Sequence, residues 1–371
     1  MDGILPNEPV NKGRQVEMDL AKYLSTIFMF FLHCLMVTSG FRNNISFYMQ
    51  RGIGQFLGCP FAAPVFMFLM GTGIVYSKNA DPVYLVKRGI SMILLGFVVN
   101  IGEFFLPHYL AGKLLGEWNI FPTAGGLLLF CVDILAFAGM AMILIGVIRK
   151  LEMPAWQMVI TALGMSVIGT FLRFHDFGGA VPNLLTGYLI GSAGGFTAFP
   201  LFNWFVFPAV GVLFGEYYIR SDDPERLLRF WPLGLAASTV YFVASWTIPG
   251  GFLSEIHHYY FMTTIDAMFC LMCIYGFIGF CYFVTLLLSD SAKEFVSKTG
   301  KNVNIIYVLQ WFLIPVTYIL ICFFKRDIVF GDLSLIVIAV LEIAACTEIA
   351  AGFKYLQKMK EGIKENDKKK D

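Results

Sequence analysis

Three residues of one apolar run have the types and the spacing to do chemistry. The run MDLAKYLSTIFMFFLHCLMV (residues 18–37) carries Asp19 and Lys22 near its start and His33 well inside it. Titratable groups are costly at membrane depth, about 2.5–3.5 kcal/mol for Asp, Lys or Arg at a helix centre. An imidazole titrates near neutral pH, which suits a general base. His33 is therefore either a buried histidine bonded to a neighbouring carbonyl or a base that removes a proton from a substrate.

A base of this kind usually has an acid beside it that favours its charged form. Four acids lie within apolar runs: Asp133, Asp266, Glu342 and Glu348. Each of them could instead pair with a polar group of another helix. By depth, Glu103 and Asp266 are the best placed, because both lie near the outer ends of their runs. We therefore predict His33, Glu103 and Asp266 as the catalytic residues.

The composition identifies the elements that must position these residues. The 371 residues are 57% hydrophobic, 16% aromatic and only 14% charged, with a mean hydropathy of +0.70. Soluble proteins have about 25% charged residues, and here the apolar runs are continuous rather than alternating. We expect an all-α, polytopic membrane helix bundle, with membrane lipid as a partner and no nucleic acid.

Ten apolar runs are long enough to cross the roughly 30 Å hydrocarbon core. They cover residues 20–40, 58–78, 84–106, 123–149, 153–171, 200–219, 228–249, 259–288, 302–324 and 331–356. The segment VPNLLTGYLIGSAGGFT (181–197) is shorter and rich in glycine, and it is predicted to be interfacial or re-entrant, with an eleventh span as the alternative.

Charge placement orients the bundle. With ten spans and a cytoplasmic N-terminus, 21 of the 27 Lys and Arg residues fall on the cytoplasmic side, as the positive-inside rule requires. An eleventh span would destroy this bias. Both termini are therefore predicted to be cytoplasmic, and all five histidines, His33 included, lie on the outer side.

The chain divides into a polar cytoplasmic segment (1–19), a transmembrane domain (20–356) and a basic cytoplasmic tail (357–371). The polar start predicts that no signal peptide is cleaved, so the first span stays in the protein. The sequence CLMC (270–273) has metal-ligand spacing but lies inside a span, where cysteine packs as a small apolar residue. No metal is predicted.

The pattern D-x-x-K-x10-H on the first span resembles the start of integral membrane acyltransferases. These are the acyltransferase-3 family and the heparan-alpha-glucosaminide N-acetyltransferase-like family. Four later segments agree in order and spacing: PVFMFLMGTGIVYS (64–77), LVKRGISMILLGFVVN (85–100), FPLFNWFVFPAVGVLFGEY (199–217) and SKTGKNVNIIYVLQW (297–311). Many acyltransferase-3 members have arginine where this chain has Lys22, which keeps the charge but not a bidentate fork.

The resemblance implies an enzyme that moves an acyl group, most simply acetyl, from cytoplasmic acyl-CoA to a hydroxyl or amine of a sugar or glycan on the outer side. It implies that His33 is the general base or a transient acyl carrier. Lys22, Lys87 and Arg88 would bind the CoA phosphates. We predict four further substrate-binding residues: Arg42, Arg173, Asn302 and Tyr307.

Two other functions remain open at this stage. A secondary transporter of a small polar solute also suits ten spans with acids at membrane depth, although the sequence lacks an internal repeat. A membrane scaffold or receptor is the third class. The short loops favour a bacterial plasma membrane. The spacing of Gly211 and Gly215 suits helix packing within one chain or between two copies, so a homodimer is also open.

Overall fold

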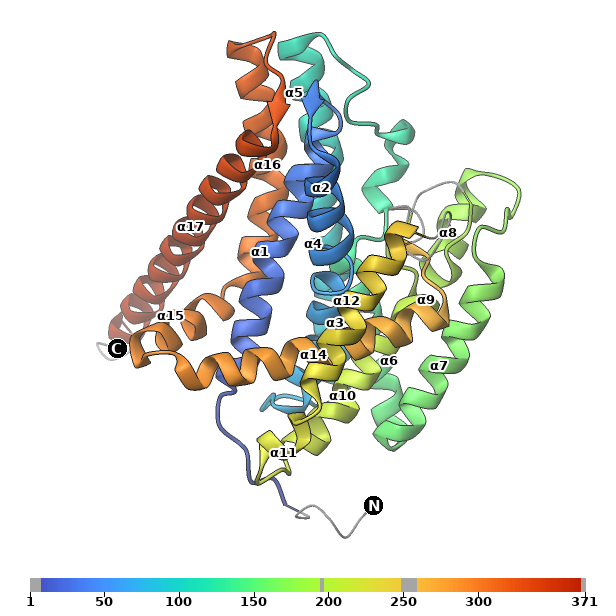
Figure 1. The fold of residues 1–371 in the computed structure, drawn as a ribbon, viewed down its shortest axis with the longest axis vertical. Helices are drawn as coiled ribbons and strands as arrows, with labels where there is room; N and C mark the ends of the chain where they lie inside the picture. Colours follow the sequence, from blue (N-terminus) through green and yellow to red (C-terminus); the bar gives the residue numbers. More distant parts are fainter. Residues whose placement is uncertain (1–7, 194–196, 248–258, 368–371) are drawn as a thin grey trace.

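The computed structural model describes residues 8–193, 197–247 and 259–367, and these form a bundle of helices (Figure 1). The α-helices are α1 (Val16–Thr38), α2 (Phe47–Met49), α3 (Ala63–Val75), α4 (Pro82–Asn100), α5 (Leu106–Leu115), α6 (Ile134–Lys150), α7 (Ala155–Leu172), α8 (Ala180–Ile190), α9 (Leu201–Trp204), α10 (Val206–Tyr218), α11 (Pro224–Leu228), α12 (Trp231–Thr247), α14 (Thr264–Leu287), α15 (Asp290–Gly300), α16 (Val303–Phe324) and α17 (Asp332–Asp367). Two π-helical stretches, η1 (Gln50–Leu57) and η2 (Ile101–Phe105), and one 3₁₀ stretch, η3 (Ala124–Phe130), complete the helical elements.

Among the described residues, seven helices are long and apolar enough to cross a membrane. They are Val16–Thr38, Pro82–Leu115, Ala155–Leu172, Pro224–Ala244, Thr264–Leu287, Val303–Phe324 and Asp332–Gln357. The other three predicted spans hold shorter or broken helices, namely α3, η3 with α6, and α9 with α10. The prediction of an all-α, multi-pass membrane bundle is confirmed.

The orientation of the helices agrees with an even number of crossings. The start of α1 and the end of α17 lie at the same end of the bundle (Figure 1). The helix α8 has 11 residues and is about 16 Å long, which is too short to span the hydrocarbon core. α17 continues as a helix to Asp367, through most of the segment predicted as a basic tail.

Glycines allow α3 and α10 to pack closely. A Cβ atom on Gly71 would collide with the backbone of Pro208, and one on Gly211 would collide with the backbone of Phe68. Small residues let the backbones of membrane helices approach in this way. Gly215 also packs against α3, at Val75. The Gly211–Gly215 spacing therefore serves packing within the chain, and a homodimer stays a prediction.

The outer end of the bundle is tied by a two-residue parallel ladder. Strand β1 (Asn43–Asn44) follows α1 and pairs with β2 (Phe330–Gly331), which precedes α17. Asp332 accepts a hydrogen bond of 2.8 Å from the backbone N–H of Ser46. These contacts fix the outer end of α1 against α17 and so hold the depth of His33.

Candidate active site

His33 lies in the core, against one face of α16. Its side chain is buried, with the residue 8% exposed. The imidazole centroid is 4.1 Å from a ring centroid of Trp311 at an interplanar angle of 31°, and 6.2 Å from that of Tyr307. Tyr307 and Trp311 are four residues apart, so both project from the same side of α16. Two aromatic rings therefore hold the imidazole in place.

Asp133 joins this group from α6. The Tyr307 hydroxyl donates a 2.5 Å hydrogen bond to Asp133 Oδ2 and accepts one of 3.0 Å from Trp311 Nε1. Asp133 stands at the N-cap of α6 with extended backbone, but its side chain does not cap that helix. The carboxylate is instead committed to Tyr307. The sequence indicated Asp133 as an acid at membrane depth, but nothing in its spacing linked it to His33.

The interruption of helical structure before α6 explains how Asp133 reaches this position. Within a bilayer, non-helical backbone needs protein partners for its carbonyl groups. Asn100 supplies them, since its Nδ2 donates to the carbonyls of Leu129 and Cys131, both at 2.9 Å. The buried amide of Asn100 thus stabilises the break that turns Asp133 into the core.

Glu103 lies in the π-helical stretch η2 that follows α4. π-Helical segments inside α-helices occur frequently at functional sites. The Glu103 carboxylate lies close enough to Asp133 to interact with it electrostatically. The structure thus links Glu103 to His33 indirectly, through Asp133 and Tyr307, and adds Asp133 to the predicted residues.

Several polar atoms of this cluster have no hydrogen-bond partner in the described part of the chain. They are His33 Nδ1, Glu103 Oε2, Asn100 Oδ1 and both amide atoms of Gln310, whose side chain lies beside the imidazole. A buried polar group without a partner costs about 1–3 kcal/mol, so such groups rarely gather in one place. Their concentration around His33 is typical of a site that completes its hydrogen bonds with a substrate.

Asp266, the third predicted catalytic residue, has a structural role. Its Oδ2 accepts a 2.7 Å hydrogen bond from the backbone N–H of Thr263, and its own N–H donates to Thr263 Oγ1 at 3.2 Å. These two bonds form a capping box that starts α14. The structure uses the Asp266 carboxylate to begin a helix.

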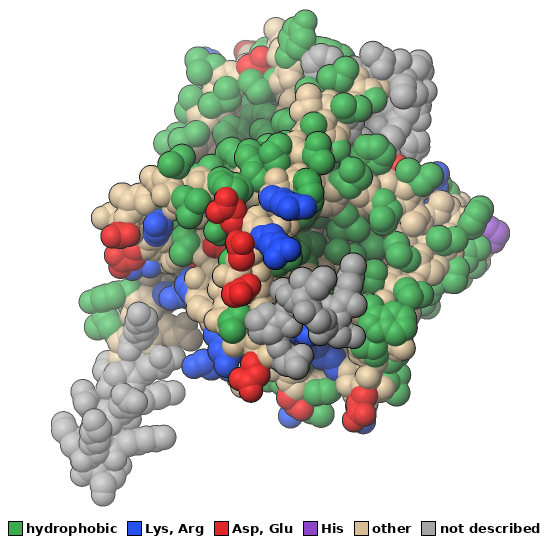
Figure 2. Space-filling view, turned by 60° about the horizontal axis from the view of Figure 1, so that its bottom comes forward, with side chains coloured by type: hydrophobic (Ala, Val, Ile, Leu, Met, Phe, Trp, Pro, Cys, Tyr) green, Lys and Arg blue, Asp and Glu red, His purple; other side chains and the backbone are tan. Residues whose placement is uncertain are grey.

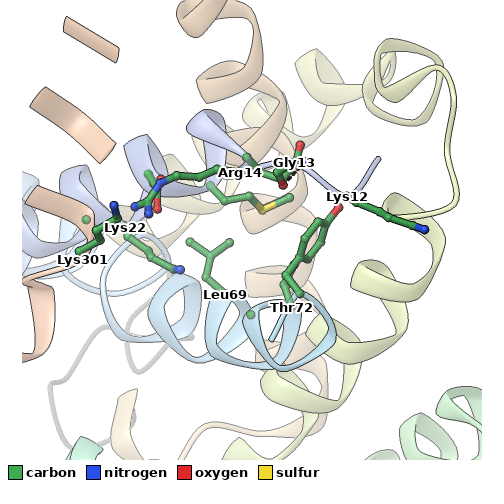
Figure 3. A pocket seen from close by; sticks show the side chains of 13 residues that line it. Lys12, Gly13, Arg14, Lys22, Leu69, Thr72 and Lys301 are labelled. Carbon is green, nitrogen blue, oxygen red and sulfur yellow. Dashed lines mark hydrogen bonds and ion pairs between the residues drawn. The ribbon is translucent and has the colours of Figure 1, made fainter. Parts of the chain in front are cut away.

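A basic cavity opens at the inner end of α1. Two adjoining pockets of about 450 and 270 Å³ share Lys22, Leu69, Gly73, Gly300 and Lys301 as lining residues. Figure 3 shows Lys22 and Lys301 on one side of the larger pocket and Lys12 on the other. On the inner face of the molecule, Lys and Arg side chains border a hollow (Figure 2). The cavity combines a cationic rim with an apolar floor from α3.

Asp19 and Arg14 organise the rim of this cavity. Arg14 Nε donates to Asp19 Oδ2 at 2.5 Å, and Arg14 Nη2 donates to the carbonyl of Ser297 at 2.7 Å. The acid of the D-x-x-K pattern therefore holds the segment before α1 against α15. Lys12, Arg14 and Lys301 were not among the predicted binding residues. Their basic side chains were visible, but only the fold brings them to Lys22.

The adjacent basic residues of α4, Lys87 and Arg88, do not both line the cavity. Arg88 lines the smaller inner pocket, whereas its neighbour Lys87 is exposed and lines neither pocket. Consecutive residues of a helix point about 100° apart, so only one of the two can face the cavity.

The remaining predicted binding residues lie at both ends of the bundle. Arg42 is 3.9 Å from Asp327 in an exposed ion pair at the outer end. Arg173 Nη1 donates to the carbonyl of Phe261 at 3.1 Å. Asn302 is the N-cap residue of α16, at the inner end. The fourth, Tyr307, belongs to the cluster around His33.

A groove of about 540 Å³ lies beside the outer half of α1. Arg51 lines it, donates to Gln55 Oε1 at 2.6 Å and lies 5.1 Å from the ring centroid of Phe47. Met36 also lines the groove and accepts a weak 4.0 Å hydrogen bond from the Tyr260 hydroxyl. Tyr260 in turn interacts electrostatically with Glu103. Tyr260 therefore contacts the lining of the groove and interacts with an acid of the buried cluster.

The family assignment rests on the chain that builds these features. Residues 14–250 match the family described as heparan-alpha-glucosaminide N-acetyltransferase, catalytic. This stretch is well over half of the chain. The chain belongs to this family. It is thus a member of a membrane N-acetyltransferase family, and a search of curated proteins and one of solved structures gave no match.

The matched stretch includes His33, Glu103 and Asp133 but ends before α16. Tyr307, Gln310 and Trp311 therefore come from outside it and complete the cluster. In the described residues, no group of three or more His, Cys, Asp or Glu side chains is placed to hold a metal ion, and all eight cysteines are free thiols.

Proposed function

We propose that the protein transfers an acetyl group from acetyl-CoA, bound in the inner cavity, to a hydroxyl or amine of a sugar or glycan that enters from the outer groove. One observation carries this proposal. Residues of α1, α3, α4, α6, α15 and α16 line the inner cavity, and four of these helices, α1, α4, α6 and α16, with η2 directly after α4, also lead to the buried cluster around His33. The arrangement joins a cationic cytoplasmic cavity to a buried base.

The cavity rim suits the phosphates of coenzyme A. Five cations line the two pockets: Lys12, Arg14, Lys22, Arg88 and Lys301. Ammonium and guanidinium groups bind phosphate through charge-assisted hydrogen bonds, which are about twice as strong as neutral ones. The apolar floor contributed by Leu69 suits the pantetheine arm.

The acyl end of the donor has a short distance to cover. Ala138 and Asn304 line the smaller inner pocket. Asp133 precedes Ala138 by five residues and Tyr307 follows Asn304 by three, which corresponds to roughly 7 Å and 5 Å at 1.5 Å per residue, in both cases away from the inner end. A thioester that extends from the cavity toward the outer side therefore approaches the cluster.

The cluster supplies the groups that thioester aminolysis or alcoholysis needs. His33 Nδ1 accepts the proton of the acceptor as its nitrogen or oxygen attacks the thioester carbonyl. The tetrahedral oxyanion then collapses, the C–S bond breaks, and His33 returns the proton to the CoA thiolate. Gln310 is placed to donate an amide hydrogen bond to the oxyanion, and Glu103 and Asp133 stabilise the imidazolium. In the second version of the mechanism, the imidazole attacks first and carries the acetyl group.

The outer groove suits a saccharide. It combines the aromatic ring of Phe47 with the amides of Gln50 and Gln55 and the cation of Arg51. Aromatic rings pack against the apolar faces of sugars, and amides and guanidinium groups bind their hydroxyl or acidic substituents. We extend the proposal to the location: a multi-pass protein of a bacterial plasma membrane, with the acceptor on the non-cytoplasmic side.

The decisive experiment uses purified protein with radiolabelled acetyl-CoA and a panel of sugars and amines. CoA release and label retained on the protein are measured for wild type and His33→Ala. Binding of acetyl-CoA by both proteins, with turnover by wild type alone, supports the proposal. Label that stays on wild type without an acceptor indicates an acetyl-histidine. If neither protein binds acetyl-CoA, the proposal is wrong, and solute transport is the function to test.

A further inference from the structure

An apolar groove adjoins the inner cavity and lies between α4, α16 and α17. Its volume is about 670 Å³, and its walls are formed mainly by Leu95, Ile305, Val308, Leu309, Phe353 and Leu356. All three helices are candidate membrane spans. The groove is therefore on a surface that meets lipid acyl chains, and its side chains suit one such chain.

The inner end of this groove differs from its walls, because it is polar and cationic. Asn304 lines both this groove and the inner cavity. Lys354 Nζ donates a 3.2 Å hydrogen bond to the carbonyl of Lys301, which holds the ammonium beside the start of α16. The start of α16 also carries the positive end of the helix dipole. The Lys354 ammonium and the positive end of the α16 dipole thus meet where the groove reaches the cytoplasmic interface.

We propose that this groove binds an anionic phospholipid of the inner leaflet. One acyl chain lies along the apolar walls, and the headgroup phosphate lies beside Lys354, Lys301 and the amide of Asn304. The cytoplasmic leaflet carries the anionic lipids, and each nearby Lys or Arg adds about 1 kcal/mol of attraction to them. A zwitterionic lipid fills the same walls but gains much less from the two lysines. The lipid site does not depend on acetyl transfer.

The test measures displacement of a fluorescent phosphatidylglycerol from the purified full-length protein in detergent micelles. Unlabelled phosphatidylglycerol is expected to displace the probe at a concentration several-fold lower than phosphatidylcholine does. Lys354→Ala should weaken phosphatidylglycerol binding about fivefold, the equivalent of one lysine near the surface. Lys150→Ala removes a basic residue at the inner end of α6, outside the groove, and should change nothing.

A second pair of variants separates the groove from the rest of the lipid-facing surface. Leu356 lines the groove and is 56% exposed, whereas Leu341 lies on the same helix, is 63% exposed and does not line it. Leu356→Trp should fill the groove and weaken probe binding at least fivefold, and Leu341→Trp should leave it unchanged. Thermal melting of each variant confirms that it is folded.

Three results would overturn the proposal. They are equal displacement by phosphatidylglycerol and phosphatidylcholine, equal effects of the two tryptophan variants, and displacement by a long-chain acyl-CoA but not by phosphatidylglycerol. The last result would assign the groove to the tail of a donor rather than to a membrane lipid.

Discussion

Polar side chains have different surroundings at the two ends of the α1 segment that runs from Asp19 to His33. At the inner end, Lys22 faces an open cavity, and Asp19 pairs with Arg14 at 2.5 Å. About three turns further along the helix, His33 is enclosed by Trp311 and Tyr307, and its Nδ1 lacks a partner among the described residues. Cavity-lining and paired charges thus occur at the inner end, whereas the groups around His33 are enclosed and include the acid Asp133.

The physical reason is the cost of desolvation. An ion moved into a low-dielectric interior loses several kcal/mol even after the protein relaxes around it. An imidazole, an amide or a phenol avoids this cost and still offers donors and acceptors. Under the proposed function, donor binding and proton transfer are separated along one helix, and this separation can be tested by changing one end at a time.

The largest expected effect comes from replacing His33 with glutamine, and Lys22→Gln is the matching change at the other end. His33→Gln removes the base and should lower kcat about 10²–10⁴-fold, the usual contribution of acid–base catalysis, with little change in the KM for acetyl-CoA. Lys22→Gln should raise that KM with kcat nearly unchanged. Steady-state kinetics measures both. If both variants change the same parameter, the division between the two ends is wrong.

Tyr307→Phe tests the surroundings of His33, at the outer end of the α1 segment. It leaves Asp133 Oδ2 without its 2.5 Å donor, and a hydrogen bond to a charged group contributes about 1.5–3 kcal/mol. We expect kcat to fall about 10- to 100-fold and the pH profile to shift. Tyr318→Phe is the matched control, because its hydroxyl lies on the same helix but bonds to Thr38 at 2.7 Å. Equal losses in the two variants would indicate a general effect on α16 rather than a role in the cluster.

Arg88→Ala and Lys87→Ala test the cavity near Lys22, at the inner end of the α1 segment. The two residues are adjacent in sequence, but Arg88 alone lines the cavity. We expect Arg88→Ala to raise the KM for acetyl-CoA about five- to tenfold, through loss of a charge-assisted hydrogen bond. Lys87→Ala should have no measurable effect. Equal increases for both would mean that the charge of the surface, and not the cavity, attracts the donor.

The smallest expected effect is that of salt. The cations of the cavity rim are partly exposed, and at 0.5 M salt their interactions with phosphate are screened over a few ångströms. The KM for acetyl-CoA should rise about two- to threefold between 0.05 and 0.5 M salt, while kcat stays constant because the buried cluster is not screened. A kcat that falls with salt would contradict the enclosure of His33.

Much of the architecture could be predicted from the sequence. Long apolar runs can bury their backbone polar groups in a membrane only as helices, so composition and run length determined the fold class. The bias of Lys and Arg predicts the orientation. The exceptions are the broken spans at η3 and at α9, where breaks in the helix shorten the regular part of the run.

The candidate site could be predicted from the sequence only in part. The pattern D-x-x-K-x10-H indicated Lys22 and His33, because both lie on one helix in which each residue adds a fixed rise. Depth favoured Asp266 over Asp133 as an acid partner of His33. In the structure, Asp266 forms a capping box and Asp133 accepts a hydrogen bond from Tyr307. Depth could not point to Asp133, because depth does not specify which neighbour a side chain faces.

The sequence by itself determined the class of the protein and the helix that carries Lys22 and His33, because these depend on local hydrophobicity and helical rise. Only the tertiary structure decided which residues surround that helix. Trp311 and Gln310 lie beyond the matched stretch, and Lys301 lies far from Lys22 in the chain. They meet α1 through close packing of membrane helices, a long-range interaction that sequence spacing does not encode.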